Sequence, residues 1–254
     1  MKTPGKVFLI LFVAMLITGS TFAQEMKSDA AQLYNDGNQK LKSGDYAGAV
    51  ASFDKALAIE KDYRIYYQKG VAFKKLEKLE DARDAFEECL KAKPDFESGY
   101  NALGAVYFAM GNYQEAATNF EKVLSTTQDA NVKSALQKNI SMAYYKLGVN
   151  ALKENKPKDA IGYLEKSVAD NNYDAAYLSL ANAYTQTKEW DNAISAGENA
   201  VKYLSIISKG GPYYFMGVAY KGKGDMTKAK EMFEKAKADA TYKKNAEYEL
   251  SSIK

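Results

Sequence analysis

Residues 97–124 read ESGYNALGAVYFAMGNYQEAATNFEKVL, and most of the chain repeats this stretch more loosely. The stretch holds two apolar patterns with helical spacing, one from Tyr100 to Phe108 and one from Ala116 to Leu124. A helix breaker, Met110-Gly111-Asn112, separates them, so the pattern predicts a helical hairpin. A single hairpin of this length cannot bury its apolar face, and we therefore expect copies of it to stack on one another.

Six copies can be aligned on the position of Gly104, which we call the marker. The markers are Gly37, Gly70, Gly104, Gly148, Ala181 and Gly217. Twelve residues after each marker stands an alanine: Ala49, Ala82, Ala116, Ala160, Ala193 and Ala229. Four residues further on are Phe53, Phe86, Phe120, Leu164, Gly197 and Phe233. Small residues thus recur where two helix backbones must approach, each followed by a residue that is bulky in five of the six copies.

These positions resemble the tetratricopeptide repeat (TPR) family, whose pattern combines a small residue, an aromatic, a later alanine and a closing proline. The resemblance implies an all-α fold, a right-handed α-solenoid of six helical hairpins closed by a C-terminal capping helix. The expected units are about 28–61, 62–95, 96–128, 129–171, 172–208 and 209–240, with the capping helix at about 240–253. The fifth unit departs from the pattern at Ala181 and Gly197, and only Pro94 keeps the closing proline.

The fourth unit carries an insertion. The step from Gly104 to Gly148 is 44 residues, ten more than the step before it, and residues 129–139 contain no proline or glycine. Ten residues make about three helical turns, so the apolar face stays in phase. We expect one long helix from Ala130 to about Glu154, with a separate short helix as the alternative. The polar run 125–129 is the expected bend between two three-repeat halves.

The first residues have the pattern of a secretory signal. Lys2 and Lys6 precede an uncharged apolar run, Val7 to Ile17, and small residues follow up to Ala23. Eleven residues are too few to span a bilayer comfortably, which disfavours the alternative of a retained anchor. We predict cleavage after Ala23, a mature solenoid domain at 24–254 without a stable membrane span, and a periplasmic or secreted location.

Composition excludes several kinds of chemistry. The chain has no histidine, which removes His-based metal sites and catalytic triads, and it contains no Gly-rich phosphate loop. Its carboxylates alternate with lysines on helix surfaces, and no concentrated basic face suits nucleic acid. The single cysteine, Cys89, takes an inward-facing helix position as a small buried hydrophobe. We therefore expect no enzyme activity, no cofactor, no metal and no nucleic-acid partner.

The resemblance implies a binding groove lined by the first helix of each unit, from positions three before and one after the marker and one turn further along. The candidate residues are Tyr34, Asn38, Tyr67, Val71, Lys74, Asn101, Phe108, Tyr145, Leu152, Leu178, Asn182 and Tyr214. Tyrosines supply rigid contact area and asparagines can hold a peptide backbone. In the alternative interpretation these tyrosines are packing residues, because a frame error of one exchanges them with Tyr66, Tyr144 and Tyr213.

The resulting functional prediction is a non-enzymatic scaffold or adaptor of the bacterial envelope that binds a peptide or protein in the groove. One alternative is binding of envelope glycan or another cell-wall polymer, with the tyrosines stacking on sugar rings. Another is a self-assembling structural protein, a homo-oligomer formed through the cap or the projecting fourth-unit helix.

Overall fold

The computed structural model describes residues 26–253, so the predicted signal sequence at 1–23 lies outside the described residues. This part of the chain forms thirteen helices and no strand. The helices are α1 (Ser28–Ser43), α2 (Tyr46–Ile59), α3 (Tyr63–Lys75), α4 (Leu79–Ala92), α5 (Glu97–Met110), α6 (Tyr113–Leu124), α7 (Ala130–Lys153), α8 (Pro157–Val168), α9 (Asp174–Thr187), α10 (Trp190–Lys202), α11 (Gly210–Lys223), α12 (Met226–Ala236) and α13 (Lys243–Ser252).

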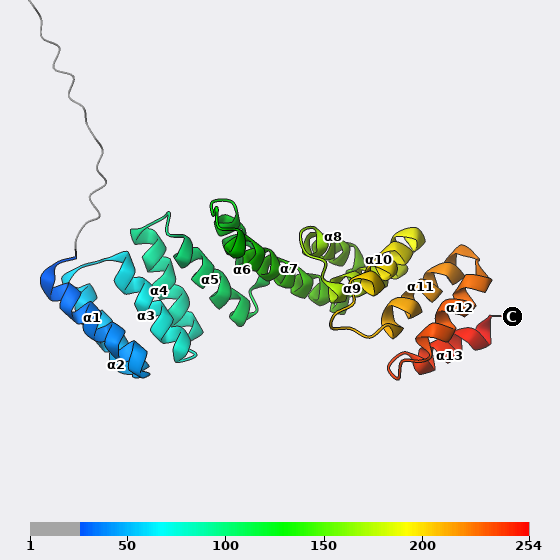
Figure 1. Ribbon diagram of the computed structural model, residues 1–254, viewed down its shortest axis with the longest axis horizontal. Coiled ribbons are helices and arrows are strands. Elements are labelled where there is room, and N and C mark those ends of the chain that lie inside the picture. The colour runs from blue at the N-terminus through cyan, green and yellow to red at the C-terminus, as the bar shows by residue number, and fades with distance from the viewer. Residues whose placement is uncertain (1–25, 254) are drawn as a thin grey trace, which may run out of the picture.

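The helices are stacked in an elongated row from α1 to α13 (Figure 1). Each odd-numbered helix from α1 to α11 packs against the even-numbered helix that follows it, and each of these pairs packs against the next pair. We call the odd-numbered members first helices and the even-numbered members second helices. The predicted all-α solenoid is confirmed. None of the helices within residues 26–253 is both long enough and apolar enough to cross a membrane.

In five of the six pairs the marker glycine of the first helix lies directly against a bulky residue of the second. A Cβ atom added to Gly70 would lie 2.7 Å from the Phe86 ring, and one added to Gly104 would lie 2.8 Å from Phe120. Gly37 and Gly217 meet Phe53 and Phe233 in the same way, and Gly148 meets Leu164. Because these bulky residues are at most 2% exposed, the glycine is required by space rather than by backbone conformation.

The fifth unit has small residues at both positions of this contact. Its first helix carries Ala181 at the marker, and its second helix carries Gly197 where the other pairs have a bulky residue. The volume is filled from the next unit, because a Cβ atom on Gly197 would lie 2.5 Å from Cγ of Met216 on α11. Met216 is only 4% exposed. The departure from the repeat pattern is therefore compensated by a neighbouring helix.

The insertion of the fourth unit forms one continuous helix, α7, as the first of the two alternatives predicted. Asp129 caps it by accepting hydrogen bonds from the backbone N–H of Asn131 at 2.8 Å and of Val132 at 3.2 Å. Its N-terminal half packs against α6 through Leu136 and Ile140, and α8 follows its C-terminal half. First helices contact one another along α1–α3–α5 and again along α7–α9–α11, whereas α5 and α7 approach less closely. At the insertion the units therefore stack through α6 and α7, without the close contact between first helices that the other units have.

A buried carboxylate holds the connection between α10 and α11. Asp174, the first residue of α9, is fully buried, and its Oδ2 accepts the backbone N–H of Ser205 and Ile206 at 2.7 Å and of Ile207 at 3.1 Å. Burial works to raise the pKa of Asp174, but these backbone donors outweigh it and hold that pKa below its ordinary value. The ionised side chain therefore fixes the segment that leads into α11.

The C-terminal end of the row is closed by α13, as predicted. Ala246 of this helix is fully buried against the cluster that contains Phe233 and Ala236, and Leu250 packs beside it. The last apolar face of α12 is therefore covered rather than left open to solvent.

Replacing one marker glycine tests this packing. Gly104→Ala should lower the free energy of unfolding by about 1–3 kcal/mol, because the added methyl group overlaps the buried Phe120 ring. Gly162→Ala is the matched control, since Gly162 is exposed on α8 and has no atom within 4 Å of an added Cβ. It should raise the stability by about 0.5–1 kcal/mol through helix propensity alone. Urea unfolding followed by circular dichroism measures both, and equal effects would contradict the packing model.

Candidate partner-binding surface

All twelve predicted groove residues lie on first helices, from α1 to α11, and none of them is fully buried. Lys74 and Asn101 are exposed, and the other ten are half-buried. The first helices thus carry the predicted residues on a surface that a partner can reach. The structure brings only some of them together.

Four predicted residues meet in one hollow between α3 and α5. Tyr67, Val71, Lys74 and Asn101 line a cavity of about 440 Å³, which we call the α3–α5 hollow. The rest of its lining comes from Lys75, Phe86, Ser98, Ala102 and Ala105. An aromatic wall, small apolar residues and a polar rim suit a short stretch of another polypeptide.

A second hollow, of about 460 Å³, lies between α1 and α3, and we call it the α1–α3 hollow. It contains the predicted residue Asn38, and its other lining residues are Asn35, Gln39, Leu41, Lys42 and Gln68. The two hollows are formed by successive first helices. Together they make a surface that runs across the first three helix pairs.

The predicted groove tyrosines are also packing residues. Their rings lie against the phenylalanines that contact the markers: Tyr34 is 6.1 Å from Phe53, Tyr67 is 5.6 Å from Phe86 and Tyr214 is 5.8 Å from Phe233, measured between ring centroids. Burial raises the pKa of Tyr67, Tyr145 and Tyr214 above the ordinary value. Each of these side chains is therefore partly in the core and partly on the surface. The groove interpretation and the packing interpretation of the sequence both apply to it.

The remaining predicted residues lie outside both hollows and contact other parts of the protein. Phe108 is edge-on to Tyr113 at 5.2 Å and Tyr145 to Tyr173 at 5.0 Å. Leu178 reaches the start of α11, where a Cβ atom on Gly211 would lie 2.9 Å from it.

The last three belong to the C-terminal half of the row. Leu152 packs against the core of units four and five. Asn182 accepts a hydrogen bond from Gln186 at 3.0 Å. Tyr214 lies 5.6 Å from Tyr242, just before α13. These three residues therefore make contacts within the chain and lie in neither hollow.

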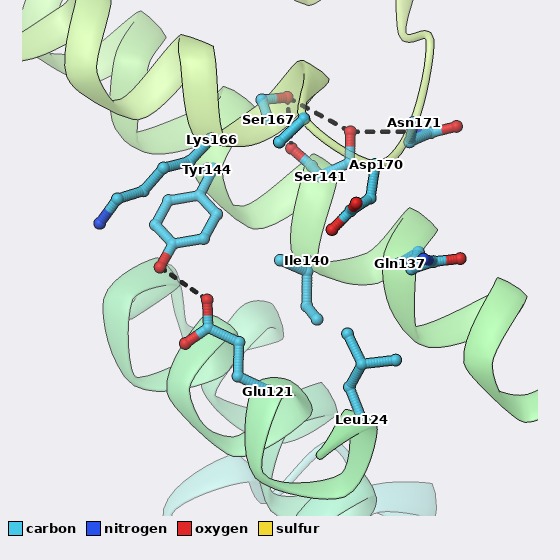
Figure 2. A pocket seen from close by; sticks show the side chains of 11 residues that line it. Glu121, Leu124, Gln137, Ile140, Ser141, Tyr144, Lys166, Ser167, Asp170 and Asn171 are labelled. Atoms are coloured by element: carbon cyan, nitrogen blue, oxygen red, sulfur yellow. Dashed lines mark hydrogen bonds between the residues drawn. The ribbon is translucent and has the colours of Figure 1, made fainter. Parts of the chain in front are cut away.

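A third hollow, of about 360 Å³, lies among α6, α7 and α8, away from the predicted groove (Figure 2). Leu124 and Ile140 form its apolar side, and the carboxylate of Asp170 points toward its centre (Figure 2). On one side the Tyr144 hydroxyl donates to Glu121 at 2.8 Å. Sequence comparison of the repeats could not reveal this hollow, because it depends on how α6, α7, α8 and the segment after α8 meet.

The polar side of the third hollow is a hydrogen-bonded network. The Ser167 hydroxyl donates to the backbone carbonyl of Ser141 at 2.7 Å, and the Asn171 amide donates to the Ser141 hydroxyl at 3.2 Å (Figure 2). Lys166 lies with its Nζ 5.1 Å from the centre of the Tyr144 ring. Most of these groups are thus used to hold α7 against α8, and we assign the network a structural role.

The hydrogen bond from Tyr144 to Glu121 is one of three that join units three, four and five to the unit before them. Tyr107 of α5 donates to Glu87 of α4 at 2.8 Å, and Tyr184 of α9 donates to Glu165 of α8 at 2.6 Å. Burial, with the neighbouring carboxylate second, raises the pKa of Tyr107 and that of Tyr144 to about 12. These phenols are neutral hydrogen-bond donors at physiological pH, and their hydrogen bonds to the carboxylates are lost when they ionise.

Reactive groups are scarce in the described part of the chain. Cys89 is fully buried, and burial raises the pKa of its thiol to about 12, so the thiol stays protonated and unreactive. Within residues 26–253 no three or more acidic or cysteine side chains are grouped so as to hold a metal ion. Every buried side-chain nitrogen or oxygen in this range has a hydrogen-bond partner.

Three family models match the chain, and each is described as a tetratricopeptide repeat. The matched residues are 95–170 for one model, 63–96 and 211–238 for the second, and 145–206 for the third. Together they cover more than half of the chain, and they include the α3–α5 hollow.

Similar curated proteins include heat shock protein STI1 of Saccharomyces cerevisiae, 31% identical over 112 residues that make up 43% of this chain and 19% of that protein. A TPR repeat-containing protein of Methanocaldococcus jannaschii is 23% identical over 210 residues, 78% of this chain and 36% of that one. The chain thus spans less than half of the length of these relatives.

Similar solved structures include the C-terminal part of a TPR repeat-containing protein from Cytophaga hutchinsonii. It is 19% identical, has a TM-score of 0.51, and the match covers 83% of this chain and 82% of that one. YrrB, described as a TPR protein with an unusual peptide-binding site, is 25% identical with a TM-score of 0.48, over 72% of this chain and 90% of that one. The first of these supports the solenoid fold.

The double role of Tyr67 predicts which substitutions affect stability. Tyr67→Ala should lower the free energy of unfolding by about 2 kcal/mol, because it removes ring contacts to Phe86 and to Phe96, the latter at 5.3 Å. Asn101 lines the same hollow but is exposed, so Asn101→Ala should keep the free energy of unfolding within about 0.5 kcal/mol of the wild type. Thermal and urea unfolding measure the difference. If Tyr67→Ala left the free energy of unfolding unchanged, the ring would belong to the surface alone.

The raised phenol pKa values predict a dependence on alkaline pH. A group whose pKa is raised on folding stabilises the protein below its ordinary pKa, here 10, and loses that contribution up to about 12. A Tyr107→Phe/Tyr144→Phe variant should be about 1–2 kcal/mol less stable at pH 8, since two hydrogen bonds are lost. Its melting temperature should then fall less than that of the wild type between pH 10 and about 11.5. If the melting temperatures of the variant and the wild type fell equally with pH, the two phenols would not contribute this stability.

Proposed function

The chain belongs to the tetratricopeptide repeat family, and on that basis we propose that it is a non-enzymatic adaptor that holds a segment of a partner protein on its first helices. Members of the family similar to this chain include proteins named for interaction with other proteins, such as the Hsp70-Hsp90 organizing protein of Triticum aestivum. The location of the binding surface has to come from this chain's own residues, because the match to that relative covers only 34% of the chain.

The observation that carries the proposal is the α3–α5 hollow. It combines the half-buried ring of Tyr67 with the exposed amide of Asn101 and the exposed amine of Lys74. The ring is held by the core, so it offers contact area without loss of side-chain entropy on binding. The amide can pair with a peptide backbone through its donor and its acceptor together.

We also propose a cellular location for this adaptor. The signal sequence predicted at residues 1–23 supports export, and the single buried cysteine suits a protein that is held by packing rather than by disulfides. We propose that the adaptor works in the periplasm or outside the cell, as part of an envelope assembly.

Capture of the partner tests the proposal. Residues 24–254 serve as bait beside a Lys74→Glu/Asn101→Ala variant, which changes two exposed residues of the hollow and should remain folded. Lys230→Glu, on an exposed site of the second helix α12, is the control for charge reversal. We expect a protein from envelope extract to be retained by the wild type and the control and lost from the double variant. Retention of the same set by all three baits would contradict the proposal.

A further inference from the structure

The charged side chains that line the two hollows on the face formed by α1, α3 and α5 are all of one sign. Lys42 lines the α1–α3 hollow, Lys74 and Lys75 line the α3–α5 hollow, and no carboxylate lines either of them. All three lysines are exposed, and the ion pairs found within residues 26–253 involve other residues. This contrasts with the second helices, where lysines and carboxylates alternate. The face therefore presents positive charge that the chain itself does not neutralise.

The amide side chains of the same linings are also unpaired. The structure shows no hydrogen bond, within the described range, to the side chains of Asn35, Asn38, Gln39, Gln68 or Asn101. An amide that donates and accepts at once matches the N–H and C=O groups of an extended backbone. The face thus combines groups for a peptide backbone with groups for carboxylates.

The lysines follow the repeat. Lys42 and Lys75 each stand five residues after a marker glycine, so they take the same position on α1 and α3, which contact each other. Packed helices lie roughly 10 Å apart, and an extended polyproline II chain advances about 3.1 Å per residue with three residues per turn. Two carboxylates three residues apart on such a segment lie on one side of it, at about the spacing of the two helices that carry the lysines. The equivalent position on α5 is Ala109, which is exposed and uncharged, so the charged stretch ends there.

We propose that this face binds an acidic, extended, internal segment of the partner protein. Two Asp or Glu side chains of the segment, about three residues apart, pair with Lys42 and Lys75, and Asn38 and Asn101 bind its backbone. Lys42 and Lys75 stand on separate helices and line separate hollows, so they bind two side-chain carboxylates rather than one terminal carboxylate. This inference rests on the proposed function and names the class of partner.

Fluorescence anisotropy with labelled decapeptides tests the inference on residues 24–254. The probe is an amidated peptide of alanine, serine and glycine with glutamates at its fourth and seventh positions. Matched probes carry lysine or glutamine at those two positions, and a fourth carries the glutamates and a free carboxyl terminus. The protein variants are Lys42→Glu/Lys75→Glu, and Lys122→Glu/Lys230→Glu, which makes the same change of charge on exposed sites of second helices.

The glutamate peptide should bind roughly tenfold more tightly than the lysine peptide, and its affinity should fall as salt is raised. Lys42→Glu/Lys75→Glu should weaken its binding by roughly tenfold, while Lys122→Glu/Lys230→Glu should leave it within about twofold. Equal binding of the glutamate and lysine peptides, or equal effects of the two variants, would overturn the inference. So would a free carboxyl terminus that improves binding by about tenfold or more.

A further variant separates this inference from the proposed function. If the glutamine or lysine peptide binds best and Asn38→Ala/Asn101→Ala abolishes that binding, the face binds peptides but does not select acidic ones. If no peptide binds at millimolar concentration, or none is affected by either pair of substitutions on this face, both proposals are wrong.

Discussion

In five of the six helix pairs the marker glycine of the first helix contacts the bulky residue sixteen positions later on the second helix. In four pairs a glycine faces a phenylalanine ring, and the space between them is too small for a methyl group. This contact fixes how closely the two backbones approach, and so it sets the direction in which the other side chains of the first helix point. In the fifth pair Gly197 replaces the large residue, and Met216 from the next unit supplies the missing volume. The constraint is therefore one of filled volume rather than of a particular residue.

The binding surface is a consequence of this packing. Tyr34, Tyr67 and Tyr214 stand three residues before a marker, and each lies beside the phenylalanine that the marker contacts. One edge of such a ring belongs to the core, so the other edge is presented in a fixed position. In the first three pairs this arrangement leaves hollows with unpaired amides and lysines. Further along, Tyr242, which precedes α13, lies against Tyr214, so the two halves of the row present different surfaces.

The repeat made much of the fold predictable from the sequence, because small and large residues recur at positions that local helix geometry relates. The length of α7 followed from counting turns in an insertion without proline or glycine. Contacts between distant residues could not be predicted in this way. Asp174 caps backbone groups of residues 205–207, which no periodic pattern connects to it. The hollow beside Ile140 is lined by residues of α6, α7, α8 and the segment after α8, which no periodic pattern brings together. The position of each candidate residue on a first helix was predictable, but not which of them share a hollow, since that depends on how neighbouring units stack.

The most direct test of the central constraint is a double-mutant cycle with Gly104→Ala and Phe120→Ala, with free energies of unfolding measured in urea. If the glycine is required because of the ring, the added methyl group should cost nothing once the ring is removed, and should even stabilise α5 by about 0.5–1 kcal/mol through helix propensity. The same destabilisation by Gly104→Ala in both backgrounds would contradict the account, because the glycine would then be needed for a reason other than this contact.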